Sequence, residues 1–219
     1  MAMSSAVLGR KVGMTQIFDE RGAMLGVTVI EAGSCRVLRV RTLEKDGYRA
    51  VQLGYGTRRR PIRPDKGQVP EGAAVPAYVR EVRLGADGEE PERGAQVAVS
   101  VFAVGDRVDV TGISRGKGFA GGVRRFHFGR GPMAHGSKYH RGPGSLSSRT
   151  SGGGGRVHPG RRLPGQLGNK RRTVQDLEIV RIDEGRGLLM VKGSVPGARG
   201  GYVTVRASVK AQAKGGSGR

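Results

Sequence analysis

The sequence contains one cysteine, no tryptophan, and only five tyrosines and five phenylalanines in 219 residues. Because Cys35 has no second cysteine to pair with, it forms no internal disulfide, and by itself it cannot make a zinc site. We expect it to be a small buried residue in a strand. No apolar run approaches the roughly 20 residues that span a bilayer, and residues 1–7 lack the regions of a signal peptide. These absences favour a protein of a reducing, cytosolic compartment.

Acidic residues are also scarce, with 18 Asp and Glu against 39 Lys and Arg, which gives a formal charge of +21. From Val110 to Gln175 there is no Asp or Glu in 66 residues, and this span holds 14 Lys and Arg. Such a charge points to a polyanionic partner. Since no Lys/Arg-rich amphipathic helix stands out, nucleic acid is favoured over a membrane surface.

The acid-free span also lacks a hydrophobic core. It contains 17 glycines and few apolar residues, without a period of 2 or 3.6 except at its edges. Apolar burial of this size does not offset the entropy of ordering, and like charges repel each other. We therefore predict that residues 113–175 form an extended basic arm that is disordered alone and structured only against RNA.

Strand patterns bounded by turn signals occupy the sequence on both sides of the arm. Their spacing predicts a barrel or sandwich, with the arm inserted between two of its strands. The predicted body comprises residues 1–112 and 176–209, with a variable excursion at about 58–95, and residues 210–219 form a flexible tail. The predicted strands are 25–30, 36–41, 48–53, 97–102, 107–110, 177–182, 187–192 and 202–207.

Segments that resemble enzyme motifs lack the neighbouring residues that those motifs require. Residues 116–121 match G-x-G-x-x-G, but a poor helix start follows and the next acidic residue is Asp176, which rejects a dinucleotide site. Thr111 stands where a phosphate loop needs glycine. No spacing among the four histidines makes a zinc site, and no carboxylate lies near them for acid/base catalysis. We predict no catalytic site, no metal and no cofactor.

RNA contacts are the alternative role for these polar residues. Arginines and lysines neutralise phosphates, glycines permit close approach of the backbone, and His, Phe and Tyr side chains stack on bases. In the arm the candidate residues are Arg115, Lys117, Arg124, Arg125, Arg130, Lys138, Arg141, Arg149, Arg156, Arg161, Arg162, Lys170, Arg171 and Arg172, with His127, His135, His140 and His158, and with Phe126, Phe128 and Tyr139 as stacking residues. A second basic patch comprises Arg58, Arg59, Arg60 and Arg63.

Several ordered motifs carry a family likeness. The segments are LGRKVGMTQIF at 8–18, VDVTGISRGKGF at 108–119, HGS with HR and GPGS at 135–145, GQLGN at 165–169, and VKGSVPG at 191–197. Together they resemble the bacterial-type ribosomal large-subunit protein three (L-three) family over nearly the whole chain. The resemblance adds Arg10, Lys11, Gln166 and Asn169 to the candidate RNA-binding residues.

The resemblance implies a mainly β fold: a six-stranded closed barrel of the translation-factor type, with a small α+β excursion and a long extended basic loop between strands. It implies a structural constituent of the large ribosomal subunit in the cytoplasm, which binds ribosomal RNA near its 3′ region, supports early assembly, and reaches toward the peptidyl transferase centre. Partners would be that RNA and neighbouring ribosomal proteins. In some bacterial members the glutamine matching Gln166 is methylated on its amide, although Leu163, Pro164 and Leu167 differ here from the common Met, Ala and Met.

Two other classes of function are compatible with a basic chain. A free RNA chaperone would bind RNA with little preference and would need no body fitted to one site. An enzyme on the related flavin-reductase or translation-GTPase barrel would need a phosphate loop, a cofactor motif or clustered carboxylates, which the sequence lacks. Competition by unrelated RNA would favour the first, and bound flavin or nucleotide turnover the second.

Overall fold

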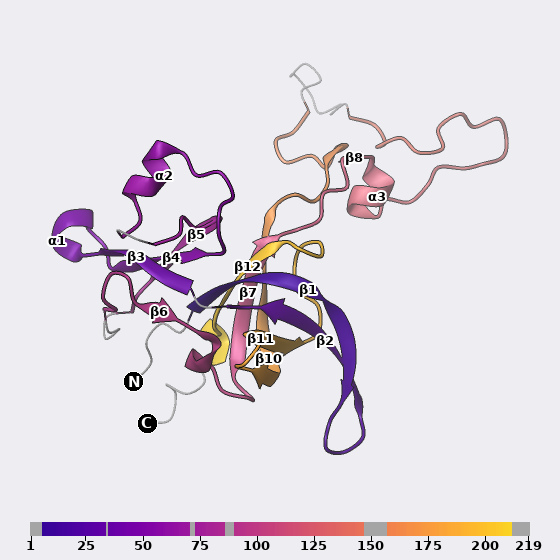
Figure 1. Ribbon diagram of the computed structural model, residues 1–219. Helices are drawn as coiled ribbons and strands as arrows, with labels where there is room; N and C mark the ends of the chain where they lie inside the picture. Colours follow the sequence, from indigo (N-terminus) through magenta and orange to yellow (C-terminus); the bar gives the residue numbers. More distant parts are fainter. Residues whose placement is uncertain (1–5, 34, 71–72, 86–89, 147–156, 212–219) are drawn as a thin grey trace, which may run out of the picture. The chain divides into compact units, whose positions relative to one another are not determined.

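The computed structural model describes residues 6–33, 35–70, 73–85, 90–146 and 157–211. The chain divides into two compact units (Figure 1). The first, which we call the body, is Met1–Ser114 with Arg171–Arg219, and the second, the inserted unit, is Arg115–Lys170. The predicted flexible tail falls mostly on residues 212–219, outside the described ranges.

Six antiparallel strands form the main sheet of the body. In spatial order they are β1 (Ala6–Phe18), β12 (Tyr202–Ala207), β7 (Arg107–Ile113), β10 (Arg171–Asp183), β11 (Leu188–Lys192) and β2 (Met24–Glu31). Strand β2 pairs with both β11 and β1, so the order of pairing returns to its first strand. Strand β7 is buried on both faces, because its five residues 108–112 are all buried, and Val108 and Val110 lie in the core.

A second sheet in the body has four strands, in the order β5 (Tyr78–Arg83), β4 (Ala50–Tyr55), β3 (Cys35–Arg41) and β6 (Gln96–Val97). Short helical turns accompany it: α1 (Leu43–Asp46), α2 (Arg63–Gly67) and the 3-10 turn η1 (Val99–Val101). The α1 turn ends at Gly47, which has φ +74, a left-handed conformation that glycine adopts without strain.

The fold class implied by the family resemblance is right in being mainly β, but its description of the body as one closed barrel with a small α+β excursion is wrong. The predicted strands at 36–41 and 48–53 do not join the main sheet, because they pair with each other and with β5 and β6 in the second sheet. Half of the predicted strand at 97–102 is the 3-10 turn η1, and only Val97 lies in a strand, β6. The strand β1, which the sequence pattern did not predict, supplies a member of the main sheet instead. The body therefore contains a four-stranded second sheet in addition to its six-stranded main sheet, and not one barrel with a small excursion.

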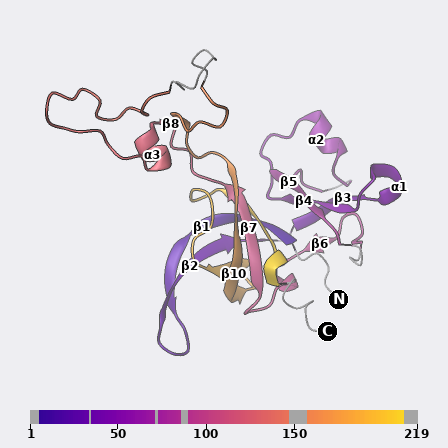
Figure 2. The ribbon, with the colours of Figure 1, turned by 180° about the vertical axis from the view of Figure 1, so that it is seen from behind.

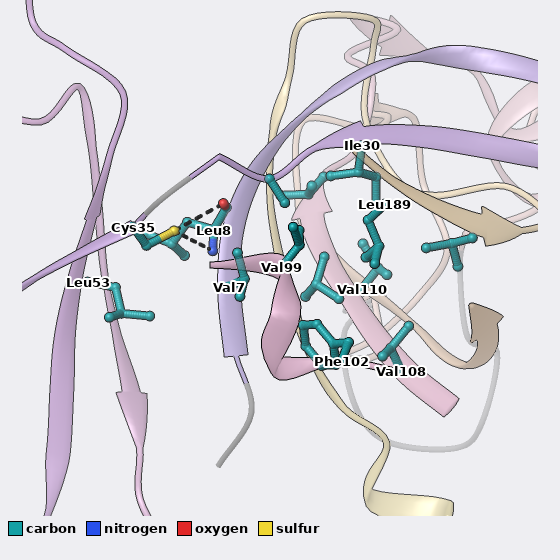
Figure 3. Close-up of a cluster of buried hydrophobic side chains, with 14 of the residues drawn as sticks. Val7, Leu8, Ile30, Cys35, Leu53, Val99, Phe102, Val108, Val110 and Leu189 are labelled. Atoms are coloured by element: carbon teal, nitrogen blue, oxygen red, sulfur yellow. Dashed lines mark hydrogen bonds between the residues drawn. The ribbon is translucent and has the colours of Figure 1, made fainter. Parts of the chain in front are cut away.

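Both sheets share one hydrophobic core. Val7 and Leu8 of β1 are buried against Val37 and Leu53 of the second sheet and against main-sheet residues such as Val110 (Figure 3). The Cys35 thiol joins the two sheets, since its Sγ lies 3.2 Å from both the backbone N and the backbone O of Leu8. Burial raises the pKa of Cys35 to about 11. The prediction of a buried cysteine in a strand is confirmed.

Strands β7 and β10 lie side by side in both views (Figures 1 and 2), and they carry the two attachment points of the inserted unit. Ile113 at the end of β7 pairs with Arg171 at the start of β10. Further along, β10 contains a bulge at which Asp176 has φ +61. The fully buried Asp109 carboxylate accepts the Asp176 N–H at 3.1 Å, so it fixes the bulge to β7.

The described residues contain no helix that is long and apolar enough to cross a membrane. Within the same ranges, no group of three or more His, Cys, Asp or Glu side chains is placed to hold a metal ion.

Candidate nucleic-acid interface

The inserted unit is built on a short antiparallel ribbon. Strands β8 (Phe119–Ala120) and β9 (Gly165–Gln166) pair Phe119 with Gln166 and Ala120 with Gly165. The backbone continues this pairing, because Lys117 N donates to Leu167 O at 2.9 Å and Leu167 N donates to Gly118 O at 2.9 Å. The ribbon thus joins the beginning and the end of the inserted unit.

A helical turn, α3 (Gly122–Phe126), packs with one face of this ribbon. The half-buried Arg125 donates from a guanidinium nitrogen to Leu163 O at 2.7 Å, and its Cζ lies 4.8 Å from the centroid of the Phe126 ring. The Phe126 and Phe128 centroids are 5.8 Å apart. A Cβ added at Gly165 would lie 2.6 Å from the Arg125 guanidinium. Although we predicted that these two phenylalanines stack on bases, they pack against each other within the inserted unit.

The loop beyond α3 closes around Tyr139. Gly131 N donates to His140 O at 3.0 Å, and His140 Nδ1 lies 3.0 Å from Pro132 O. The Tyr139 hydroxyl accepts the Gly144 N–H, and Tyr139 remains 49% exposed. His140 is therefore half-buried with a backbone partner, and it is less available for RNA than a fully exposed histidine.

Most predicted RNA-binding residues of the arm are exposed. Arg161, one of them, also donates to Ser145 O at 2.9 Å. Arg149 and Arg156 lie outside the described residues. Arg171 and Arg172, which we placed in the arm, belong to β10 of the body and are exposed. The exposed residues of the inserted unit are Arg115, Lys117, Arg124, His127, Arg130, His135, Lys138, Arg141, His158, Arg161, Arg162, Gln166, Asn169 and Lys170.

The body residues divide into two groups. Lys11 is turned inward, because its Nζ donates to Val195 O at 3.0 Å and to Gly197 O at 3.5 Å, and burial lowers its pKa. Arg58 is ion-paired with Asp65, which reduces its availability for phosphate. The exposed basic residues of the predicted body set are Arg58 itself, Arg10, Arg59, Arg60 and Arg63.

Comparisons with known proteins identify the family to which this chain belongs. A family model described as Ribosomal protein L3 matches residues 86–188, which include the whole inserted unit. The large ribosomal subunit protein uL3 of Carboxydothermus hydrogenoformans is 51% identical over 211 residues, which cover 95% of this chain and 99% of that protein. The chain belongs to the ribosomal protein L3 family. The uL3 proteins of Shouchella clausii and Pelotomaculum thermopropionicum are 48% and 50% identical, covering 95% and 96% of this chain and the full length of each relative.

Membership of the L3 family confirms the resemblance read from the ordered motifs. The family is one of ribosomal proteins and not of enzymes, so the prediction that the chain is not an enzyme is also confirmed. The individual RNA contacts assigned to the candidate residues stay predictions.

One exposed residue of the L3 match was missed by sequence reasoning. Phe119, in the first strand of the ribbon, is 83% exposed and lies opposite the exposed Gln166. From the sequence we predicted stacking for the other three aromatic residues of the arm, and these are the ones whose side chains have contacts inside the inserted unit. No periodicity marks Phe119, because its exposure is set by pairing with a strand 46 residues later in the sequence.

Proposed function

We propose that this chain is a structural constituent of the large ribosomal subunit, binds large-subunit ribosomal RNA and works in the cytoplasm as part of the ribosome. The observation that carries the proposal is about 50% identity over nearly the full length to proteins named for that subunit. The exposed basic residues of the inserted unit support RNA as the partner, because the unit holds 12 Lys and Arg and no Asp or Glu.

The finer proposal concerns how the two units divide this task. The body binds near the 3′ region of the RNA during early assembly and contacts neighbouring ribosomal proteins. The inserted unit threads between RNA segments and reaches toward the peptidyl transferase centre. Family resemblance supports both statements, and the two-unit division of the chain is consistent with them. Gln166, exposed on β9, is in addition a proposed site of amide methylation.

The experiment that tests constituency is purification of ribosomes from the source organism, a high-salt wash, and mass spectrometry of the separated subunits. We expect near-stoichiometric retention in the large subunit, and a peptide containing Gln166 heavier by one methyl group if the modification is present. Loss from washed subunits would instead support a free RNA chaperone.

Phosphate contact has its own measurement. If about half of the 14 basic residues of the acid-free span meet phosphates, log affinity for protein-free large-subunit RNA falls with log salt with a slope of roughly −6. A slope near about −1 would contradict binding dominated by phosphates.

Ordering on RNA is the remaining part of the proposal. We expect residues 129–162 of the free protein to give sharp, poorly dispersed NMR signals that disperse and broaden when RNA is added. Dispersed signals from a rigid segment in the free protein would contradict it.

A further inference from the structure

We propose that Phe119 stacks on an unpaired RNA nucleobase and that Gln166, opposite it on the ribbon, hydrogen-bonds the same nucleotide. This inference rests on the proposed RNA-binding function and names the contact that one face of the inserted unit makes. Its starting observation is exposure: at 83%, Phe119 is the most exposed of the described large hydrophobic side chains. An aromatic ring is costly to leave in water, because it forgoes the burial of its apolar surface.

Pairing in the ribbon determines which side chains share a face. Directly opposed residues of antiparallel strands point to the same side, and successive residues point to opposite sides. Phe119 and Gln166 therefore share one face, whereas Ala120 and Gly165 share the other. Ala120 is 7% exposed and Gly165 is buried, while Phe119 and Gln166 are exposed. The ribbon has a packed side and an open side.

The packed side holds the open side in place. Arg125 contacts Gly165 so closely that a Cβ there would meet its guanidinium, and Arg125 is itself fixed by Leu163 O and by the Phe126 ring. Because Phe126 and Phe128 contact each other, they stabilise the turn that follows β8. Phe119 is thus presented on a supported ribbon, which lowers the entropy lost when it binds a partner.

The charge around Phe119 identifies the kind of partner. Lys117 and Arg124 are exposed on either side of it in sequence, and the inserted unit has no carboxylate. RNA supplies phosphates for these cations and aromatic base faces for the ring, and unpaired bases are the ones whose faces are open to aromatic side chains. The Gln166 amide offers both donors and an acceptor to the edge of a base or to a ribose hydroxyl. A nucleotide in a single-stranded segment or loop fits both side chains.

Fluorescence can report this contact directly, because the chain contains no tryptophan. In Phe119→Trp the new indole is the protein's only tryptophan, and it retains an aromatic face for stacking. We expect its emission to be quenched when the full-length protein is titrated with protein-free large-subunit ribosomal RNA. The matched control is Phe18→Trp, at a body position that is 69% exposed, where we expect little quenching. Unchanged emission of the Phe119→Trp protein at RNA saturation would overturn the proposal.

Affinity measurements separate stacking from charge. Phe119→Leu keeps an apolar side chain but loses the ring, so affinity for the same RNA should fall roughly 5- to 150-fold. The salt slope should stay unchanged, because no phosphate contact is removed. Phe18→Leu is the control, with an expected change below about 2-fold. Equal affinities of Phe119→Leu and wild type would refute the stacking contact alone, whereas failure of the wild type to bind would refute the proposed function.

The pairing of the two side chains is tested by a double-mutant cycle. If Phe119 and Gln166 hold one nucleotide, the combined Phe119→Leu and Gln166→Ala variant should lose less affinity than the product of the two single losses. Losses that multiply independently would assign Gln166 to a different contact. Thermal melting of each variant should match wild type, since both side chains are exposed.

Discussion

Replacing Asp109 by alanine is expected to destabilise the body strongly. The Asp109 side chain is fully buried, and its carboxylate accepts the N–H of Asp176 at 3.1 Å and that of Val209 at 3.5 Å. A buried donor left without an acceptor costs about 1–3 kcal/mol. Arg206 adds an ion pair at 3.5 Å, but its side chain is 47% exposed, so the pair contributes less than about 1 kcal/mol. Because the 3.5 Å bond is the weaker one, we expect a total loss of about 2–4 kcal/mol.

The assay is urea unfolding of the full-length protein, followed by far-ultraviolet circular dichroism. A loss of stability appears as a lower midpoint with an unchanged m-value. Asp106→Ala is the matched control, because the exposed Asp106 carboxylate accepts a single backbone N–H, that of Ala103 at 2.8 Å. We expect that control to lose no more than about 1 kcal/mol. If both alanine variants lost the same small amount, the role given to the buried carboxylate would be wrong.

Three further perturbations test other parts of the structure. Gly168→Ala should open the ribbon, because Gly168 has φ +73 and a Cβ there would overlap the backbone of residue 115. Amide hydrogen exchange near β9 should therefore rise far more than in the control Gly118→Ala, where φ is +67 but no atom lies close to the added Cβ. Burial and the raised pKa of Cys35 predict that iodoacetamide at pH 8 labels it slowly in the native protein and fast in urea, and equal rates would contradict this. Deleting the inserted unit and joining Ser114 to Arg171 through Asn-Gly should leave a folded body with normal urea unfolding. The dependence of its RNA affinity on salt concentration should be much shallower, and an unfolded product would show that the body depends on the inserted unit.

Local patterns predicted most strands of the main sheet. Residues 25–30, 177–182 and 202–207 each lie within an observed strand, and residues 187–192 begin one residue before β11. Strand β1 was missed because its alternation is interrupted. Its first four residues are all buried, since β1 contacts the second sheet as well as its neighbours in the main sheet. A strand buried on both faces does not show a period of 2.

The sequence pattern did not show which strands belong to which sheet. The sequence pattern does not distinguish the strands at 36–41 and 48–53 from those of the main sheet, and only long-range partners decide where they pair. Cys35 illustrates this dependence, because it contacts Leu8, 27 residues earlier. The residue pattern within one strand shows which of its faces is buried, but it does not identify the neighbouring strand.

The positive charge of the candidate site could be predicted from the sequence, but the contacts of its individual residues could not. Composition alone located the basic segment, because a lack of carboxylates needs no structure to be visible. The internal partner of Arg125 is 38 residues away in sequence and that of Lys11 is 184 residues away, so neither was foreseen. The same long-range pairing decides that Phe119 is exposed while Phe126 is packed.

The position of the insertion explains how the chain tolerates a long segment with so little core. Because Ile113 and Arg171 are paired neighbours, the insertion costs the body only the entropy of closing a loop, on the order of 3–4 kcal/mol for roughly 57 residues. Ordering the backbone of the segment costs about 1–2 kcal/mol for every residue. The Phe126–Phe128 contact contributes only about 0.5–1.5 kcal/mol beyond the apolar area it buries. Stability of the body and order in the inserted unit therefore have separate sources: the shared core stabilises the body, and we propose that RNA supplies most of the order in the inserted unit.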